Sequence, residues 1–452
     1  MSKVSDYLLA NTSKPPARRA LLALEDGTVF EGVACGAEGE AFGEICFNTS
    51  MEGYLEIVTD PSYAGQIVVL TYPQVGNYGV NLEDAQAEHP ALRGLVVRDM
   101  CATPSSWRSQ EALGDYLIRE GVVAVEGIDT RALVRHIRDH GAQRAGIITT
   151  GEDAAAFLEK VRTSPDLVGV NLAREVSCSG IRRLGTSVPT RLFGLAEPRP
   201  ARRTVVVYDC GAKRSILRDL ARSGCSITTV PWNTPAETVL SMNPDGVFFS
   251  NGPGDPDAVG ETYEQVGKIL GKVPVFGICL GHQMMAKAAG GEIEKLKFGH
   301  HGGNHPVQNL LTGRVEVTAQ NHGFCPRFQS LGALVPELSG GFDNHEEDLR
   351  AWARRGIAPV VDNERFGRIR LTHVNLDDGT AEGFAFLDIP AFSVQYHPEA
   401  APGPTDAHYL FTAFARLMAG DADYLDIDIA ADRLDGWSFA DAGAAATEGK
   451  VA

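Results

Sequence analysis

Short blocks of hydrophobic residues recur along the second half of the chain, and amphipathic segments separate them. The blocks are TVVVYD (204–209), SITTVP (226–231), DGVFFS (245–250) and VPVFGI (273–278). Such short apolar runs are typical of buried parallel strands. Between the first two, AKRSILRDLARSG predicts a helix with Ile216, Leu217 and Leu220 facing inward and Gly224 as its stop. The pattern predicts a doubly wound α/β domain with a mostly parallel sheet.

The first half of the chain has a different pattern. It begins with alternating strands broken by an Asp-Gly turn signal at Asp26. Further on, IDTRALVRHIRDHG predicts a helix with Asp129 or Thr130 as its cap and Gly141 as its end. Its apolar face consists of Leu133, Val134 and Ile137. We therefore expect a mixed β/α domain over residues 19–178.

Three segments lack a clear hydrophobic period. Residues 1–18 have no apolar core of the kind found in secretion signals and are expected to form a loose leader. Residues 179–203 are rich in Pro, Gly and Arg and are expected to form a linker, or alternatively to contain a short edge strand. Residues 419–452 form an acidic tail, expected to be largely mobile, with one short element around Trp437.

Composition narrows the class of protein. The formal net charge of −17 over 452 residues disfavours nucleic acid as a partner, because phosphate binding needs clustered Lys and Arg. There is no run of eighteen apolar residues, so no membrane partner is expected and a cytoplasmic location is predicted. The eight cysteines contain no CxxC pair, which argues against disulfides and a zinc ribbon.

One cysteine has an unusual neighbourhood. The chain runs Gly277-Ile278-Cys279-Leu280-Gly281 between an apolar strand and a predicted helix. This G-x-C-x-G pattern is the thiol form of a nucleophile elbow, a tight strand-to-helix turn that needs small flanking residues. It is expected to project the Cys279 sulfur into solvent at a helix N-terminus, where the dipole stabilises a thiolate. The Leu280 N–H is placed to meet a developing oxyanion.

Two further stretches supply the rest of a hydrolase. Tyr396-His397-Pro398-Glu399 follows a strand-like segment, so His397 is a candidate base and Glu399 a candidate partner that orients it. Ser250-Asn251-Gly252-Pro253-Gly254-Asp255-Pro256 is a rigid loop at a strand end. The Gly252 N–H is a second candidate oxyanion donor.

Residues 204–418 resemble a class I, triad-type glutamine amidotransferase domain, with Cys279, His397 and Glu399 as the implied triad. The stretches FNTSMEGYLEIVTDPSYAGQIVVLTYPQVGNYG (47–79), GIDTRALVRHIRDHGAQRAGII (127–148), FGHHGGNHPV (298–307) and TAQNHGF (318–324) are similar to the carbamoyl-phosphate synthetase small subunit. GLVVRD (94–99) also belongs to this resemblance. The resemblance covers residues 19–418.

The resemblance implies a glutamine site and a partner. Its implied glutamine-binding residues are Ser50, Gly252, Gly254, Leu280, Gln283, Asn321, Gly323 and Phe324. It further implies that L-glutamine is hydrolysed through a thioester on Cys279, and that the ammonia passes to a large subunit. That partner would make carbamoyl phosphate for arginine and pyrimidine synthesis. This chain contains no P-loop pattern, which agrees with ATP and Mg being bound by the partner, so no cofactor is expected here.

Some features remain outside this interpretation. His300, His301 and His305 suggest a metal, but they fit a packed loop and have no carboxylate nearby in sequence, so we predict no metal. Residues 325–370 exceed the family's usual connection. This insertion contains HEEDLRAWARRG, a possible charged helix with Trp352 on one face. It is interpreted as a surface elaboration, with a lid or a partner contact as alternatives.

Two other functions are compatible with the elbow alone. One is an amidotransferase that serves a different synthetase, such as one that makes anthranilate or GMP; the N-terminal stretches argue against it. The other is a non-catalytic binding or regulatory subunit that has kept the fold; the intact triad argues against it.

Overall fold

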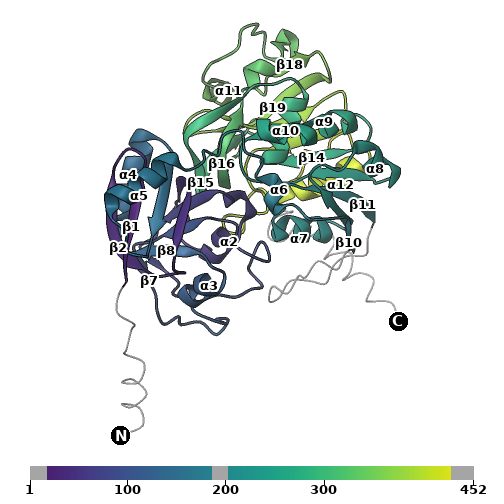
Figure 1. Cartoon of the computed structure of the whole chain (residues 1–452). Helices are drawn as coiled ribbons and strands as arrows, with labels where there is room; N and C mark the ends of the chain where they lie inside the picture. The colour runs from purple at the N-terminus through teal and green to yellow at the C-terminus, as the bar shows by residue number, and fades with distance from the viewer. Residues whose placement is uncertain (1–17, 186–201, 429–452) are drawn as a thin grey trace, which may run out of the picture.

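The computed structural model describes residues 18–185 and 202–428, which form two domains lying against each other (Figure 1). The strands of the N-terminal barrel are β1 (Arg19–Leu24), β2 (Val29–Ala34), β3 (Glu40–Asn48), β4 (Gln66–Leu70), β6 (Gly94–Val96), β8 (Val123–Glu126) and β9 (Arg144–Ile148). They close in the order β1-β2-β8-β6-β4-β3-β9. The pairs β3–β4, β4–β6 and β6–β8 are parallel and the other pairs are antiparallel, so the predicted mixed β/α domain is built on a mixed sheet. A separate small pair consists of β5 (Gln74–Val75) and β7 (Asp99–Met100).

Short helices cover this barrel. They are α2 (Tyr54–Val58), α3 (Leu113–Arg119), α4 (Thr130–His140), α5 (Ala154–Thr163) and α6 (Ala173–Val176), with a 3₁₀ turn η1 (Pro61–Tyr63). The prediction for α4 is confirmed, because Asp129 caps it by accepting from the Ala132 N–H at 3.0 Å. Leu133 and Ile137 are fully buried, and Gly141 ends the helix with φ 98°.

The C-terminal domain is built on a single twelve-stranded sheet. Its strands are β10 (Arg182–Gly185), β11 (Arg203–Asp209), β12 (Cys225–Pro231), β13 (Gly246–Phe249), β14 (Val275–Ile278), β15 (Ile293–Asn309), β16 (Val315–Pro326), β17 (Ala333–Leu334), β18 (Val360–Asn363), β19 (Gly367–Asn375), β20 (Ala381–Phe386) and β21 (Ala391–Val394). The main path is β10-β12-β11-β13-β14-β21-β20-β19-β15-β16, and the run from β12 to β21 is parallel. The predicted buried strands are therefore confirmed as β11, β12, β13 and β14.

Helices cover both faces of this sheet, as a doubly wound fold requires. The helices are α7 (Arg214–Arg222), α8 (Ala236–Ser241), α9 (Gly260–Ile269), α10 (Leu280–Ala288), α11 (Arg350–Arg355) and α12 (Tyr409–Met418), with 3₁₀ turns η2 (Pro256–Val259), η3 (Phe328–Leu331) and η4 (Pro336–Leu338). One apolar core lies beneath α8, α9 and α10, and a second lies beneath α7 and α12. Within the described ranges, no helix combines the length and apolar character that crossing a bilayer would need.

The N-terminal domain lies against the edge of the sheet at which the parallel strands β13 and β14 end. Hydrogen bonds join the two domains, including Asn321 Nδ2 to Asp60 Oδ2 at 3.0 Å and Asn251 Nδ2 to Ser62 Oγ at 2.9 Å. The rings of Phe47 and Phe298 stack across the same boundary, with centroids 5.9 Å apart. Both domains therefore contribute atoms to any site at that edge.

The three irregular segments have different outcomes. The expected linker contains β10 at residues 182–185, which pairs antiparallel with β12 and so realises the edge-strand alternative. Three ranges lie outside the described residues: 1–17, which is almost all of the expected leader, 186–201, and 429–452, which includes Trp437. The start of the tail is described, and there Tyr424, Leu425 and Ile427 pack against the core beneath α12.

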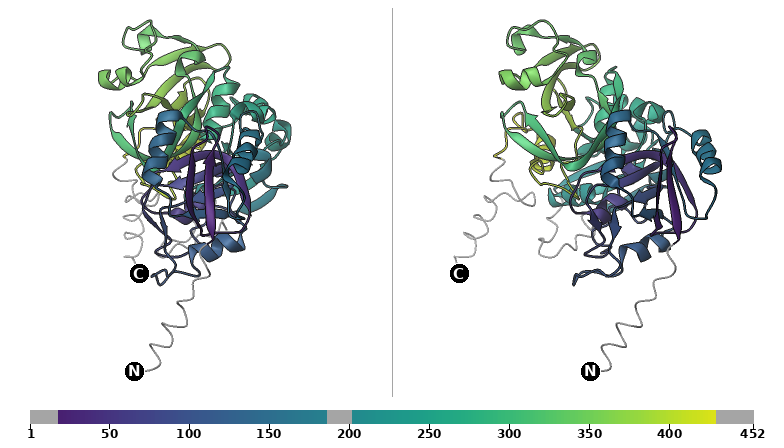
Figure 2. Two further views of the ribbon diagram at one scale, coloured as in Figure 1. Left: turned by 60° about the vertical axis from the view of Figure 1, so that its left-hand side comes forward. Right: turned by 90° about the vertical axis from the view of Figure 1, so that its left-hand side faces the viewer.

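The insertion at 325–370 extends the sheet instead of covering the thiol. Strand β18 pairs antiparallel with β19, and β17 pairs with β18, at the end of the molecule away from the barrel (Figure 2). The predicted charged helix is only the six residues of α11. Trp352 on this helix is fully buried and packs edge-on against Phe342 at 5.5 Å. The segment therefore shares the main core.

Substitution of Trp352 tests this integration. Trp352→Ala should lower the free energy of unfolding by about 3–5 kcal/mol, because it leaves a large cavity in a shared core. Urea denaturation of the full chain measures the change. Exposed Arg354 on the same helix is the control, and Arg354→Ala should change stability by less than about 0.5 kcal/mol. Equal stability of the two variants would mean that the insertion folds independently of the core.

Candidate active site

Cys279 occupies a strained turn between β14 and α10. Its backbone angles are φ 53° and ψ −104°, a conformation that residues with side chains rarely adopt. Its N–H donates to the Val394 carbonyl at 2.9 Å, which ties the turn to β21. A Cβ at Gly281 would lie 2.2 Å from the Phe249 oxygen, and one at Gly277 would lie 2.7 Å from the Met285 sulfur. Close packing therefore explains both glycines of the G-x-C-x-G pattern.

The expectation that the thiol projects into solvent is wrong. Cys279 is only 2% exposed, and its sulfur lies 3.6 Å from the Asn321 carbonyl oxygen on β16. The adjoining cavity measures about 30 Å³ and is lined by residues of both domains. The elbow does point its side chain beyond the sheet, but β16 and the N-terminal domain enclose that space. Motif geometry alone does not reveal a cover that comes from another domain.

His397 lies beside the thiol and is held from behind by Glu399. Its Nδ1 is 2.7 Å from Glu399 Oε1, and its Nε2 has no hydrogen-bond partner among the described residues apart from its contact with Cys279. The His397 N–H donates to the Ala319 carbonyl at 2.8 Å, which fixes the loop after β21. The three residues predicted as a triad are therefore brought together.

Buried charges set the protonation of this group. Burial lowers the pKa of His397, but the Glu399 carboxylate and the hydrogen bond with Cys279 outweigh it and raise that pKa to about 10. Burial raises the pKa of Glu399, but Lys213 and His397 outweigh it and bring that pKa to about 2. At neutral pH the imidazole is therefore protonated and the carboxylate is ionised.

Lys213 is a component that the sequence argument missed. Its ammonium lies 2.9 Å from Glu399 Oε1 and 2.5 Å from the Ala400 carbonyl oxygen, and the residue is only 3% exposed. It sits between β11 and α7, again at the carboxyl end of a parallel strand. That position is the signal that could have identified it, because ligand and catalytic groups gather at these strand ends.

The two candidate oxyanion donors lie in adjacent loops. Leu280 is the first residue of α10, so the helix itself offers its N–H no partner. A Cβ at Gly252 would come within 2.8 Å of the Leu280 side chain and 2.3 Å of the Cys210 oxygen. Only glycine therefore allows the loop after β13 to approach the elbow this closely.

The other predicted glutamine residues fall into two groups. Gly252, Gly254, Gln283, Asn321, Gly323 and Phe324 line the cavity beside Cys279. Ser50 instead lines a separate small cavity, which it shares with Lys213 and His397. The structure thus places Ser50 near the imidazole and away from the cavity of the thiol.

Two of the lining amides already have partners. Asn321 Nδ2 donates to Asp60, and its Oδ1 lies 2.9 Å from His301 Nδ1. Gln283 Nε2 donates to the Phe324 carbonyl at 2.8 Å and to Gln395 at 3.1 Å. In this arrangement the backbone around Asn321 faces the cavity, while its side chain holds the two domains together.

The N-terminal domain supplies cavity residues that the motifs did not indicate. Glu44 and Lys295 form an ion pair of 2.6 Å between the domains, and both line the cavity beside Cys279. Leu167 closes another part of it. None of residues 325–370, all of which the structure describes, lines this cavity, so the structure gives no support to the lid alternative.

The three histidines that suggested a metal do not act as one group. His301 faces Asn321 and the ring of Tyr63, whereas His300 and His305 face the opposite side of the hairpin formed by β15 and β16. The sequence argument relied on the lack of a nearby carboxylate, but the fold brings Asp378 to 2.7 Å from His300 Nε2.

Comparison with known proteins agrees with this geometry. Residues 22–147 match the family described as carbamoyl-phosphate synthase small chain, CPSase domain. Residues 206–417 match the family described as glutamine amidotransferase class-I. The two matches correspond to the barrel and to the large sheet.

Whole-chain relatives share both domains. The carbamoyl phosphate synthase small chain of Syntrophotalea carbinolica is 49% identical over 405 residues, covering 88% of this chain and 98% of the relative. Those of Akkermansia muciniphila and Thermotoga maritima are each 45% identical and cover 89% of this chain, with 98% and 99% of the relatives covered. The chain therefore belongs to the carbamoyl phosphate synthase small chain family and is a class I glutamine amidotransferase.

Proposed function

We propose that this chain hydrolyses L-glutamine with Cys279 as the nucleophile and delivers the ammonia to a synthetase large chain. The observation that carries the proposal is that Cys279 and His397 follow the adjacent parallel strands β14 and β21 at one edge of the sheet, with His397 Nδ1 2.7 Å from Glu399 Oε1. A thiol hydrolase needs this order of groups.

The first step forms a thioester. The Cys279 thiolate, whose proton has passed to His397, attacks the side-chain amide carbon of glutamine, and the N–H groups of Gly252 and Leu280 stabilise the oxyanion. Residues of both domains line the cavity beside Cys279, so the substrate enters between the two domains. Backbone atoms near Gly254, Gly323 and Phe324, together with Gln283, hold its amino-acid end.

Proton transfer then follows from the charges of the site. His397 carries a proton at neutral pH and donates it to the departing amine, which releases ammonia. The same imidazole then accepts a proton from the water that attacks the thioester. Glutamate leaves, and the thiol is restored. Glu399 and Lys213 keep the ring oriented throughout the cycle, and Ser50 lines the small cavity that His397 and Lys213 also line.

The proposed partner is a carbamoyl phosphate synthase large chain. It would bind ATP and Mg and convert the ammonia with bicarbonate into carbamoyl phosphate for arginine and pyrimidine synthesis. The names of the relatives as small chains support this pairing. The proposed reaction on this chain needs no bound cofactor, because the thiol, the imidazole and backbone N–H groups supply every step. A cytoplasmic location stays a prediction.

Loss of the thiol separates the two reactions. In the complex with its large chain, Cys279→Ser should lower glutamine hydrolysis by at least about 10⁴-fold, because the nucleophile is lost. Carbamoyl phosphate synthesis from ammonium salts should continue. Cys101→Ser, in the N-terminal domain, is the matched control and should retain both reactions. Glutaminase activity that persists in Cys279→Ser would overturn the assignment.

Lys213 is predicted to act through the imidazole. Lys213→Met should lower kcat for glutamine hydrolysis by about 100-fold, with a much smaller change in KM. Without the ammonium, Glu399 is no longer held as a carboxylate that orients the His397 imidazole. The Lys213 ammonium keeps the pKa of Glu399 low, so removing it raises that pKa. The stability and activity that depend on ionised Glu399 are present above this pKa and are lost as the pH falls through it. The acidic limb of the kcat profile should therefore move to higher pH.

The shape of the pH profile distinguishes positioning from a purely structural role. Lys268→Met on the exposed side of α9 is the control and should leave the profile unchanged. A lower kcat for Lys213→Met with an unmoved acidic limb would contradict the proposed role of Lys213.

A further inference from the structure

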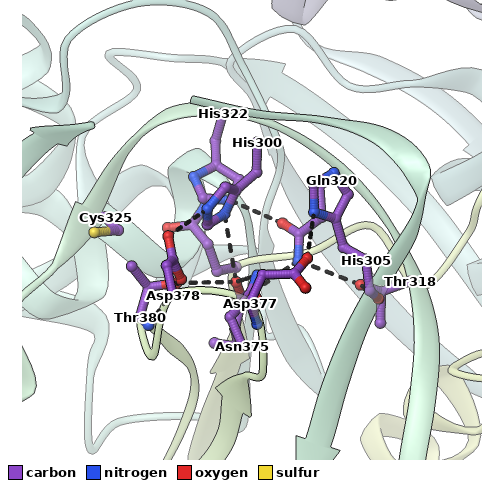
Figure 3. Close-up of polar contacts among 12 residues, drawn as sticks. His300, His305, Thr318, Gln320, His322, Cys325, Asn375, Asp377, Asp378 and Thr380 are labelled. Carbon is purple, nitrogen blue, oxygen red and sulfur yellow. Dashed lines mark hydrogen bonds and ion pairs between the residues drawn. The ribbon is translucent and has the colours of Figure 1, made fainter. Parts of the chain in front are cut away.

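A second group of buried polar side chains lies outside the triad. His300 on β15 and His322 on β16 point toward each other (Figure 3). Together with Glu382 on β20 they bring three potential ligand atoms within 4.8 Å of one another. All three residues are buried, and Glu382 is fully so. Glutamine hydrolysis as derived above uses neither His300 nor Glu382.

The outer nitrogen of each imidazole is already bonded. His300 Nε2 lies 2.7 Å from Asp378 Oδ2, and the His322 Nδ1–H donates to the Phe324 carbonyl at 2.8 Å. Metal-binding histidines characteristically use one ring nitrogen for the ion and donate the other N–H to a carboxylate or a backbone carbonyl. Both rings of this cluster show that arrangement.

The other ring nitrogens, His300 Nδ1 and His322 Nε2, have no hydrogen-bond donor opposite them. His300 Nδ1 has no hydrogen-bond partner among the described residues, although His300 is only 6% exposed. His322 Nε2 faces Gln320 Oε1 at 2.7 Å. A neutral imidazole that donates from Nδ1 has a lone pair on Nε2, so this contact sets one acceptor against another.

Turning the Gln320 amide does not remove the conflict. Gln320 Nε2 now donates to Glu382 Oε2 at 3.0 Å and to the Thr318 hydroxyl oxygen at 3.2 Å. A flipped amide would satisfy His322 but would point its oxygen at the Glu382 carboxylate. Thr318 offers no proton in return, because its hydroxyl donates to the His305 carbonyl. In either orientation the cluster lacks one positive charge or one proton.

We propose that His300 Nδ1, His322 Nε2 and a Glu382 oxygen bind one divalent transition-metal ion of the Zn²⁺ class. Two imidazoles and a carboxylate are a known ligand set for Zn²⁺, and the Gln320 oxygen or water completes four-coordination. Ligands about 2 Å from a tetrahedral ion are about 3.3 Å apart, so donors that now lie within 4.8 Å of one another move closer together by up to about 1.5 Å on binding.

The surroundings favour a cation. Asp378 and Asp377 add carboxylates beside Glu382, with Asp377 lying 3.7 Å from His305 Nδ1. A neighbouring pocket of about 300 Å³ reaches Asp378 from the surface and is also lined by Glu294, Glu346 and Glu347. An acidic entrance raises the local concentration of cations.

A proton is the competing occupant. A protonated His300 would form ion pairs with Asp378 at 2.7 Å and with Glu382 at 3.8 Å without any metal. This alternative satisfies His300 but leaves the acceptor contact between His322 and Gln320 in place. A proton on Glu382, with the Gln320 amide turned, would relieve that contact but would leave His300 Nδ1 without a partner. The metal satisfies both rings at once, and for this reason we favour it.

Bound metal would link three strands of the sheet. Strand β16 also carries Asn321, Gly323 and Phe324, so the ion would hold the hairpin that lines the thiol cavity. An ion that binds only the folded chain stabilises it by mass action. The readouts are therefore metal affinity and thermal stability, which do not depend on glutamine hydrolysis.

The test uses full-length protein stripped of metal with a chelator. Co²⁺ titration should give one equivalent of a visible d–d absorption band without a thiolate-to-metal charge-transfer band, and Zn²⁺ should displace it and raise the Tm. Asp378→Asn should weaken binding by about 10- to 100-fold, because it removes the outer partner of His300. Glu382→Gln and His300→Asn should weaken it at least as much.

The controls separate this site from other metal-binding groups. The half-buried His136 and the exposed His140 lie on α4 with their rings 4.4 Å apart, and replacing both with Ala should leave the tight site intact. Circular dichroism of the metal-free variants checks their fold, and the partly exposed Asp378 offers a variant with little effect on packing. Lack of binding, affinity unchanged in Asp378→Asn and Glu382→Gln, or a thiolate band would each overturn the proposal.

Discussion

The parallel pairing of β14 with β21 is the constraint on which the rest of the site depends. It places Ile278 opposite Val394, so the residues that follow each strand emerge at the same edge of the sheet. Cys279 and His397 meet there although they are far apart in sequence. β11 ends at this edge too, which brings Lys213 behind Glu399. A change of register between the two strands would separate the nucleophile from its base before any side chain was altered.

Much of the architecture could be predicted from local pattern, because its determinants are local. The apolar runs became the parallel strands, Asp129 caps α4, and the elbow required glycine at positions 277 and 281. The predictions that were wrong or missing concern contacts between segments far apart in the sequence. Burial of Cys279 depends on another domain, and Glu382 reaches the histidine cluster from a strand that the sequence argument did not examine. Spacing along the chain carries no information about such encounters.

The domain boundary functions as part of the site. Asp60 and Ser62 of the N-terminal domain accept hydrogen bonds from Asn321 on β16 and from Asn251 in the loop after β13, the two segments that flank the thiol. These segments therefore take their positions from a domain that contributes no triad residue. This arrangement gives a physical reason for the N-terminal barrel beyond any contact with a partner chain: without it, β16 and the loop after β13 would lose their buried polar partners.

The burial of the thiol also bears on redox chemistry. Thiol–disulfide exchange needs the attacking sulfur to approach a disulfide sulfur directly. Cys279 is only 2% exposed, so a bulky disulfide such as oxidised glutathione cannot bring its sulfur to the thiol unless the lining residues move, whereas hydrogen peroxide is only slightly larger than water. The buried position of Cys279 therefore selects among oxidants by size. It shields Cys279 from mixed-disulfide formation between turnovers and leaves oxidation to a sulfenic acid as the route of damage.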